Sequence, residues 1–262
     1  MKIYIHTDIE GVAGVVQWDH AHGHGGPADP AGPYYERSKR LLTAEINAAI
    51  EAALEEGADE IVVSDDHGPG GIDPELLHPK ARLLFGKPFP RGRGFDRSFD
   101  AMFFIGQHAM NLTPNANLCH TYSSKGIRRM LLNGQEIGEI GMRAALAGSF
   151  GVPVALFTGD DKACAEAKAI LPAVELVAVK TSLGRTSALC LHPIEARKAI
   201  KAGVARALRR LGDYKPYLPP PPYEFIVEPY DLARCHPDDR SFDRPAGKPQ
   251  VYHATDFLEI SR

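Results

Sequence analysis

The chain has 262 residues and a mass of 28.5 kDa, with 44% hydrophobic and 24% charged residues, a composition that excludes disordered and fibrous classes. Lys and Arg number 30 against 33 Asp and Glu, which gives a net charge of -3 and no basic field, so we expect no nucleic-acid partner. The length predicts one large domain, or one domain with a smaller appendage.

The N-terminal residues carry no pattern typical of export or membrane insertion. The first apolar stretch is interrupted by His6, Asp8 and Glu10, and no run approaches the ~18 apolar residues of a membrane helix. The four cysteines lie far apart in the sequence, without a metal-binding spacing. We therefore expect a cytoplasmic protein with free thiols and no membrane partner.

Short apolar runs alternate along the chain with segments of helical periodicity, which is typical of βαβ units. Strands are predicted at residues 2–7, 60–64, 101–106, 152–157 and 174–179. The spacing of apolar residues predicts helices at about residues 34–56, 138–149 and 194–211. Asn133 and Gly134 predict a two-residue hairpin turn. The expected fold class is α/β, with a mostly parallel central sheet flanked by helices.

A proline-rich tract divides the sequence. Residues 215–222 read KPYLPPPP, which is incompatible with regular helix or a central strand and predicts a stiff connector. We expect an α/β domain over residues 1–215, followed by this connector and a small β-rich C-terminal extension over residues 216–262. The His- and Gly-rich residues 17–33 predict a long loop.

Polar side chains follow three of the predicted strands. Asp8 and Glu10 follow the first strand, and their spacing points both carboxylates the same way in extended backbone. His67 and His108 follow two further strands, at the sheet edge where open α/β sheets bind ligands. Glu139, at the start of a predicted helix, adds a third carboxylate. Such a set suits one or two zinc-like ions. Each residue alone is also compatible with a structural role, and spacing does not decide between these readings.

Five motifs in register carry a family resemblance. They are Asp8-Ile9-Glu10-Gly11, Ser64-Asp65-Asp66-His67, Gly106-Gln107-His108-Ala109, Cys119-His120 and Ile137-Gly138-Glu139-Ile140-Gly141. Together they resemble the DppA-type zinc-dependent D-aminopeptidase family, with similarity over nearly all of residues 1–215. The resemblance implies a metallohydrolase domain there.

The resemblance also implies a site and a reaction. Two zinc ions are bridged by Asp8, and four further ligands complete the coordination: Glu10, His67, His108 and Glu139. His120 matches the family's catalytic histidine, and we favour a general base that assists attack by a metal-activated water. Mn2+ or Co2+ suits the same ligands. The implied substrates are short peptides with an N-terminal D-amino acid, and the implied assembly is a homo-oligomer, a decamer in the characterised case.

The sequence departs from the family at three places. His6 stands where the family usually has a small Ser, and it is either a supporting partner of the ligands or an additional ligand. The loop at residues 17–33 has no familiar counterpart, and the C-terminal end is shorter than the family's. The stretch Arg91-Gly92-Arg93-Gly94 is either an ordinary basic loop or contacts a substrate carboxylate; the sequence does not choose.

Several alternatives remain open at this stage. His20, His22 and His24 are candidates for a separate metal site, although their Gly- and Pro-rich surroundings favour exposed side chains. Neither a nucleotide-binding nor a serine-hydrolase motif is present. A metal-dependent amidohydrolase acting on non-peptide amides, or a non-catalytic metal- or peptide-binding protein, would use the same residues. Cys119 beside His120 is not expected to form a dyad, because neighbours on a strand point to opposite faces.

Overall fold

The computed structural model describes residues 1–22, 32–236 and 239–261. His24, one of the histidines considered above, lies outside the described residues. No helix within the described part of the chain combines the length and apolarity needed to cross a bilayer.

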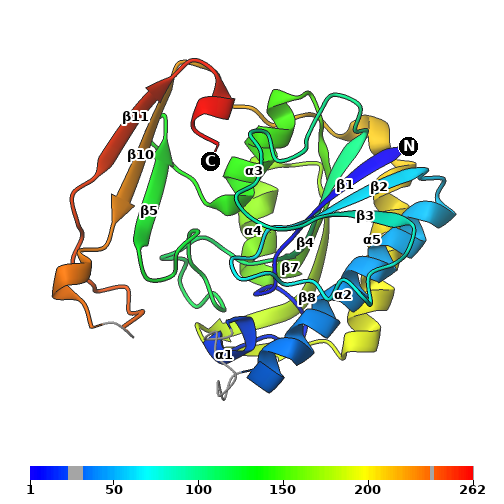
Figure 1. The fold of residues 1–262 in the computed structure, drawn as a ribbon, viewed down its shortest axis with the longest axis horizontal. Helices are drawn as coiled ribbons and strands as arrows, with labels where there is room; N and C mark the ends of the chain where they lie inside the picture. The colour runs from blue at the N-terminus through cyan, green and yellow to red at the C-terminus, as the bar shows by residue number, and fades with distance from the viewer. Residues whose placement is uncertain (23–31, 237–238, 262) are drawn as a thin grey trace.

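A seven-stranded sheet forms the centre of the fold (Figure 1). Its strand order is β3-β2-β1-β4-β7-β8-β9, and all neighbours pair in parallel except β8 and β9. The strands are β1 (Lys2–Thr7), β2 (Glu60–Asp65), β3 (Ala81–Leu84), β4 (Ala101–Gln107), β7 (Val154–Asp160), β8 (Glu175–Gly184) and β9 (Ser187–Cys190). The predicted fold class is confirmed.

Helices cover both faces of this sheet (Figure 1). The helices are α1 (Trp18–Ala21), α2 (Gly32–Glu55), α3 (Glu139–Ser149), α4 (Asp161–Ile170) and α5 (Pro193–Arg209). Side chains alternate along β1, so Ile3 and Ile5 pack with α2 and α5, whereas Tyr4 packs with α3 and α4. Apolar side chains on both faces explain why the central strands are buried throughout.

A second sheet of four antiparallel strands lies at the opposite end of the molecule from α5 (Figure 1). Its order is β11-β10-β5-β6, formed by β5 (Ile127–Leu132), β6 (Gln135–Glu136), β10 (Tyr223–Pro229) and β11 (Gln250–Ala254). Asn133 and Gly134 both have positive φ, as the predicted hairpin turn requires. Because β10 pairs with β5, the C-terminal residues share a sheet with the preceding part, and the division at residue 215 stays a prediction.

The sequence analysis missed α1, α4, β3 and β9. Helix α1 lies within residues 17–33, which we expected to form a long loop. Helix α4 is rich in Ala, and these small side chains do not form a clear apolar stripe in the sequence. The helix begins after Asp160, whose carboxylate accepts hydrogen bonds from the backbone of Lys162 and Ala163. Strands β3 and β9 are four residues long and lie at the two sheet edges, where partial exposure weakens the apolar pattern.

Candidate metal centre

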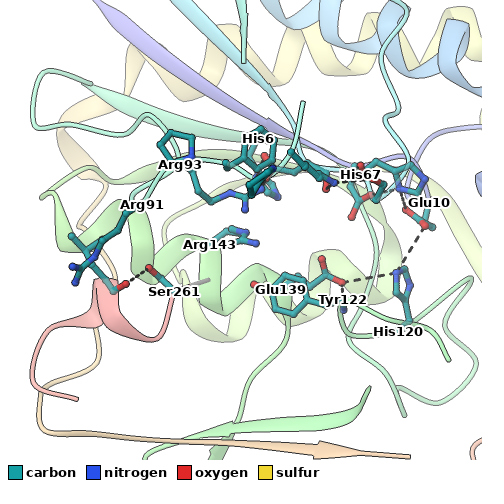
Figure 2. A pocket seen from close by; sticks show the side chains of 18 of the residues that line it. His6, Glu10, His67, Arg91, Arg93, His120, Tyr122, Glu139, Arg143 and Ser261 are labelled. Carbon is teal, nitrogen blue, oxygen red and sulfur yellow. Dashed lines mark hydrogen bonds and ion pairs between the residues drawn. The ribbon is translucent and has the colours of Figure 1, made fainter. Parts of the chain in front are cut away.

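The candidate ligands meet at the carboxyl edge of the large sheet. The chain order reverses at β1, which lies between β2 and β4, and such a switch point opens a crevice at the strand ends. Asp8 and Glu10 follow β1, His67 follows β2 and His108 follows β4. Glu139 is the first residue of α3. A cavity of about 840 Å³ opens over these residues (Figure 2).

Glycines bring the backbones of β1 and β4 unusually close at this edge. Gly11 donates its backbone N–H to the carbonyl of Gly106 over 2.8 Å. A Cβ at Gly11 would lie 2.0 Å from the carbonyl oxygen of Gln107, and Gly106 has a φ of +77°. A side chain at either position would therefore push the two ligand-bearing turns apart.

Two buried ionisable groups anchor the turn that follows β1. The Lys180 ammonium donates to the carbonyls of Glu10 and Val15 and to the side chain of Asn117. Glu45, from α2, accepts a hydrogen bond from the backbone of Ala13 over 3.0 Å. Burial lowers the pKa of Lys180 to about 8 and raises the pKa of Glu45 to about 7.

Asp8 contacts two histidines through its two different oxygens. Its Oδ1 lies 3.1 Å from His67 Nδ1, and its Oδ2 lies 3.3 Å from His108 Nε2. Glu10 Oε2 lies 3.3 Å from His67 Nδ1, on the first side. Glu139 Oε1 lies 3.4 Å from His108 Nε2, on the second side. The acids and histidines therefore fall into two adjoining groups that share Asp8.

The second ring nitrogen of each histidine is held by a backbone carbonyl. His67 Nε2 lies 2.7 Å from the Ala21 carbonyl, and His108 Nδ1 lies 2.9 Å from that of Ala109. Since a carbonyl only accepts hydrogen bonds, these nitrogens carry the protons. When the rings are neutral, as metal binding requires, the nitrogens that face the carboxylates carry the lone pairs. An outer hydrogen bond fixes the tautomer of metal-binding histidines in the same way.

In the absence of a cation, the acids and histidines shift one another's pKa values. Burial opposes the charged form of His67, but Glu10 and Asp8 outweigh it and raise its pKa to about 10. Burial likewise opposes charge on His108, yet the hydrogen bonds to Asp8 and Glu139 raise its pKa well above the usual range. Burial also opposes ionisation of Asp8, but His108 and His67 hold its pKa well below the usual range. The buried carboxylates are therefore stabilised by positive charge between them, from a protonated histidine or a bound cation.

Several buried ligand atoms lack a hydrogen-bond partner among the described residues. They are both carboxylate oxygens of Glu10 and Nε2 of His108. The potential ligand atoms form three groups within 4.8 Å: Glu10, His22 and His67; His108, His120 and Glu139; and Asp8, Glu10 and His108. Imidazole nitrogen and carboxylate oxygen are common zinc donors, so the residues present fit zinc. We call the seven residues of these groups the carboxylate–histidine cluster.

His120 belongs to this cluster, and one of its ring nitrogens faces the acids. Its Nδ1 is 2.8 Å from the Leu118 carbonyl, so Nε2 carries the lone pair. That Nε2 lies 3.9 Å from Glu10 Oε1 and 4.0 Å from Glu139 Oε1 (Figure 2). Burial, followed by the charge of His108, lowers the pKa of His120, which favours the neutral base.

Comparison with known proteins shows the family of this chain. A family profile described as D-aminopeptidase matches residues 1–237. The chain is 34% identical over 223 residues to a D-aminopeptidase of Bacillus subtilis (strain 168), covering 84% of this chain and 78% of that protein. The chain belongs to the D-aminopeptidase family. The predicted family and the predicted enzyme class, a metallo-aminopeptidase, are confirmed.

The fold of the family also agrees. The solved structure of the Zn-dependent D-aminopeptidase DppA from Bacillus subtilis, described as a self-compartmentalizing protease, superposes with a TM-score of 0.86. It is 29% identical in sequence, and the match covers 100% of this chain and 94% of that one. The likeness therefore extends over the whole D-aminopeptidase fold, including the C-terminal strands.

His22 joins the carboxylate–histidine cluster in a way that the sequence analysis did not predict. The ring stacks against His67 at 5.6 Å and against Trp18 at 5.7 Å, and its Nε2 is buried without a described partner. Burial lowers the pKa of His22 to about 4. His20 instead stacks on Tyr34 and accepts a hydrogen bond from the backbone of Val16. Both side chains are partly buried, so the expectation that they are exposed is wrong.

A basic group lies in the same cavity, beyond Glu139 (Figure 2). His6 belongs to none of the ligand groups found among the described residues. Its Nδ1 lies 2.7 Å from Asp66 Oδ2. Asp66 also pairs with Arg93, whose guanidinium lies over the Phe89 ring at 4.2 Å. Burial, followed by the charges of Arg143 and Arg93, lowers the pKa of His6 well below its usual range. We call His6, Asp66, Arg93 and Arg143 the arginine cluster.

Cys119 takes no part in the site. It lies in an irregular segment, not on a strand as we expected, but its Sγ faces the Thr113 carbonyl at 3.7 Å. Burial raises the pKa of the Cys119 thiol. The buried, protonated thiol is a poor nucleophile, so the prediction that it forms no dyad with His120 holds for a different reason.

Proposed function

We propose that this chain is a zinc-dependent aminopeptidase with two zinc ions, which hydrolyses short peptides or amides carrying an N-terminal D-amino acid. The observation that carries the proposal is the orientation of His67 and His108, which present lone pairs to buried acids, two of whose oxygens have no described partner. The family and the described activity of its similar members support the substrate class.

The contacts support a division of the ligands between two ions. His67 and Glu10 would hold one ion together with Asp8 Oδ1, and His108 and Glu139 would hold the other together with Asp8 Oδ2. Asp8 is the proposed bridge because its two oxygens face different histidines. When bound, zinc supplies Lewis acidity that polarises a carbonyl and lowers the pKa of water.

His120 is the proposed general base and acid. Its neutral Nε2 accepts a proton from the attacking water and returns it to the nitrogen of the leaving amine. The acyl–nitrogen bond breaks, the hydroxyl of water stays on the acyl carbon, and the reaction needs no other reactant. The Nδ1 hydrogen bond to Leu118 keeps the ring in the tautomer that this exchange requires.

The oligomer is the second part of the proposal. The similar DppA structure is described as a self-compartmentalizing protease, which supports a closed homo-oligomer for this chain. Following the resemblance, we propose a decamer in the cytoplasm whose enclosed sites restrict substrates to short peptides. Sedimentation of the purified protein tests this, and a monomer would contradict it.

Metal content tests the proposal most directly. Protein purified without chelator or added metal is assayed for zinc, manganese and cobalt per chain, and then for release of alanine from D-alanyl-D-alanine and L-alanyl-L-alanine. We expect two zinc ions and faster hydrolysis of the D-dipeptide. A chain that binds no metal after reconstitution, or that binds zinc and D-peptides without releasing amino acid, would contradict the proposed aminopeptidase.

A further inference from the structure

The arginine cluster contains a buried positive charge without a counter-ion in contact. Arg143 lies on α3 and is 5% exposed. Its Nη1 has no hydrogen-bond partner among the described residues, and no carboxylate in the described part of the chain forms an ion pair with it. Figure 2 shows its guanidinium in the cavity, between Arg93 and Glu139. A buried charge is costly unless it is paired, so this one points to an absent anion.

Two further hydrogen-bond donors accompany Arg143. Arg93 Nε and the Tyr122 hydroxyl are both buried without a described partner, and both side chains line the cavity. The Arg143 guanidinium lies 5.1 Å from the centre of the Tyr122 ring. Guanidinium groups donate in a planar fork that matches a carboxylate. The Asp66 oxygens pair with His6 and Arg93. The other buried atoms without a described partner at this end can donate hydrogen bonds, as a bound anion requires.

The neighbouring charges leave this end of the cavity positive. Asp66 contacts His6 and Arg93, and it forms no ion pair with Arg143 in the described part of the chain. Burial, followed by the charge of Arg143, lowers the pKa of Arg93 to about 9. Lys87 is occupied by the carbonyls of Asp66, His67 and Gly68. Glu259 lines the same cavity from the segment Phe257–Glu259 but forms no ion pair with either arginine in the described part of the chain.

The helix sets the distance between the two clusters. Glu139 and Arg143 are four residues apart on α3, so they lie on one face with a rise of about 6 Å. Extended peptide advances about 3.5 Å per residue. A substrate whose scissile amide lies beside Glu139 therefore brings a carboxylate of the next residue to Arg143.

We propose that Arg143 and Arg93 bind a carboxylate on the residue that follows the scissile amide, so that the enzyme selects acidic leaving groups. The inference rests on the proposed peptidase function and names its substrate class. The carboxylate has two possible sources: the free C-terminus of a dipeptide, or an acidic side chain at that position. Both present the same chemistry to the arginines.

Three matched substrates separate these sources. They are D-alanyl-D-alanine, its C-terminal amide, and D-alanyl-D-glutamic acid with an amidated C-terminus. For zinc-loaded wild type we expect kcat/KM to be about 30-fold or more higher for at least one carboxylate substrate than for the neutral amide. Preference for the dipeptide assigns the C-terminal carboxylate, and preference for the glutamyl amide assigns the side chain.

Variants connect the preference to Arg143. Arg143→Met should lower kcat/KM for the preferred substrate by about 30-fold and leave the neutral amide near its wild-type value. Arg143→Lys should recover part of the preference, because it restores charge without the planar fork. Arg91→Met is the matched control: Arg91 is 61% exposed at the rim and pairs with Asp256, so its loss should leave the preference intact.

The outcomes separate this inference from the proposed function. Equal kcat/KM for all three substrates, or an equal loss for all three in Arg143→Met, would overturn carboxylate recognition while leaving the peptidase in place. If wild type hydrolyses none of them, the proposed function fails, and calorimetry decides the inference. Tighter binding of the dipeptide than of its amide, lost in Arg143→Met, would support the arginine site; equal or absent binding would overturn it.

Discussion

The two ends of the cavity differ in how they are built. The carboxylate–histidine cluster takes most of its residues from the ends of β1, β2 and β4, where the parallel sheet fixes their positions. The arginine cluster combines β1 with the turn after β2, the irregular segment that follows β3 and the second turn of α3. The first end holds buried acceptors without a described partner, on Glu10 and His108. The second end holds buried donors without one, on Arg93 and Arg143, beside an Asp66 that is already paired. This polarity suits a substrate that offers a carbonyl at one end and an anion at the other.

Asp8→Ala should have the largest effect on metal binding by the carboxylate–histidine cluster. It removes the carboxylate that contacts both His67 and His108, so neither ion keeps its shared ligand. We expect zinc content near zero and a loss of activity of more than about 1000-fold, because the Lewis acid contributes several kcal/mol. Elemental analysis and dipeptide hydrolysis measure the two effects. Retention of two ions would refute the bridging assignment.

The sequence predicted this end of the cavity because strands and motifs place its residues. Asp8, Glu10, His67 and His108 follow apolar runs that were recognisable as parallel strands, and such strands end at one edge. Glu139 was predictable from the hairpin and helix that flank it. The meeting of Asp8, Glu10, His67 and His108 follows from the order of the parallel strands, whereas Glu139 reaches them because α3 packs beside the strand ends.

The other end could not be predicted in the same way. Arg143 reads as an ordinary polar position within a helix, and its burial depends on how α3 packs beside the segment at residues 118–126 and the C-terminal turn. Arg93 was noticed, but its pairing with Asp66 depends on the path of an irregular segment. The contact of His22 with His67 depends on where the chain lies after α1. Tertiary packing decides these contacts, and no local pattern records them.

His120→Ala should have the next largest effect and should leave the metals in place. We expect kcat to fall by about 100- to 10000-fold, the range for loss of a general acid–base group, with zinc content unchanged. Single-turnover hydrolysis of D-alanyl-D-alanine, together with elemental analysis, measures both. Because His120 Nε2 is close to Glu10 and Glu139, loss of zinc from this variant would make it a ligand instead of a base.

Glu45→Gln tests the buried carboxyl group that holds the turn after β1. The measured quantity is the pH dependence of the free energy of unfolding. Burial raises the pKa of Glu45 from 4.5 to about 7 in the folded protein. Below pH 4.5 the carboxyl group is protonated in both the folded and the unfolded chain, so it does not lower the stability of the fold. As pH rises towards 7, ionisation favours the unfolded chain, so stability falls by up to about 3 kcal/mol.

The Glu45→Gln substitution should remove this loss of stability with rising pH, while its side-chain oxygen still accepts the hydrogen bond from the Ala13 N–H. Urea unfolding of the metal-loaded protein between pH 4.5 and 8 should therefore give a flatter stability profile for Glu45→Gln than for wild type. Glu55→Gln, at the exposed end of the same helix, is the matched control and should follow the wild-type profile. Parallel profiles for wild type and Glu45→Gln would show that the carboxyl group does not titrate in this range.

The smallest expected effect comes from His22, which lies on the side of the first cluster away from the arginines. Its Nε2 is buried, unpartnered among the described residues and grouped with Glu10 and His67. If it adds a donor to the ion held by those two residues, His22→Ala should weaken zinc affinity by about tenfold, measured by competition with a fluorescent chelator. His20→Ala is the control, because that ring stacks on Tyr34 and belongs to none of the ligand groups in the described chain. Equal zinc affinity in the two variants would make His22 a packing partner of His67, and the cluster would then end with the residues that the family motifs supply.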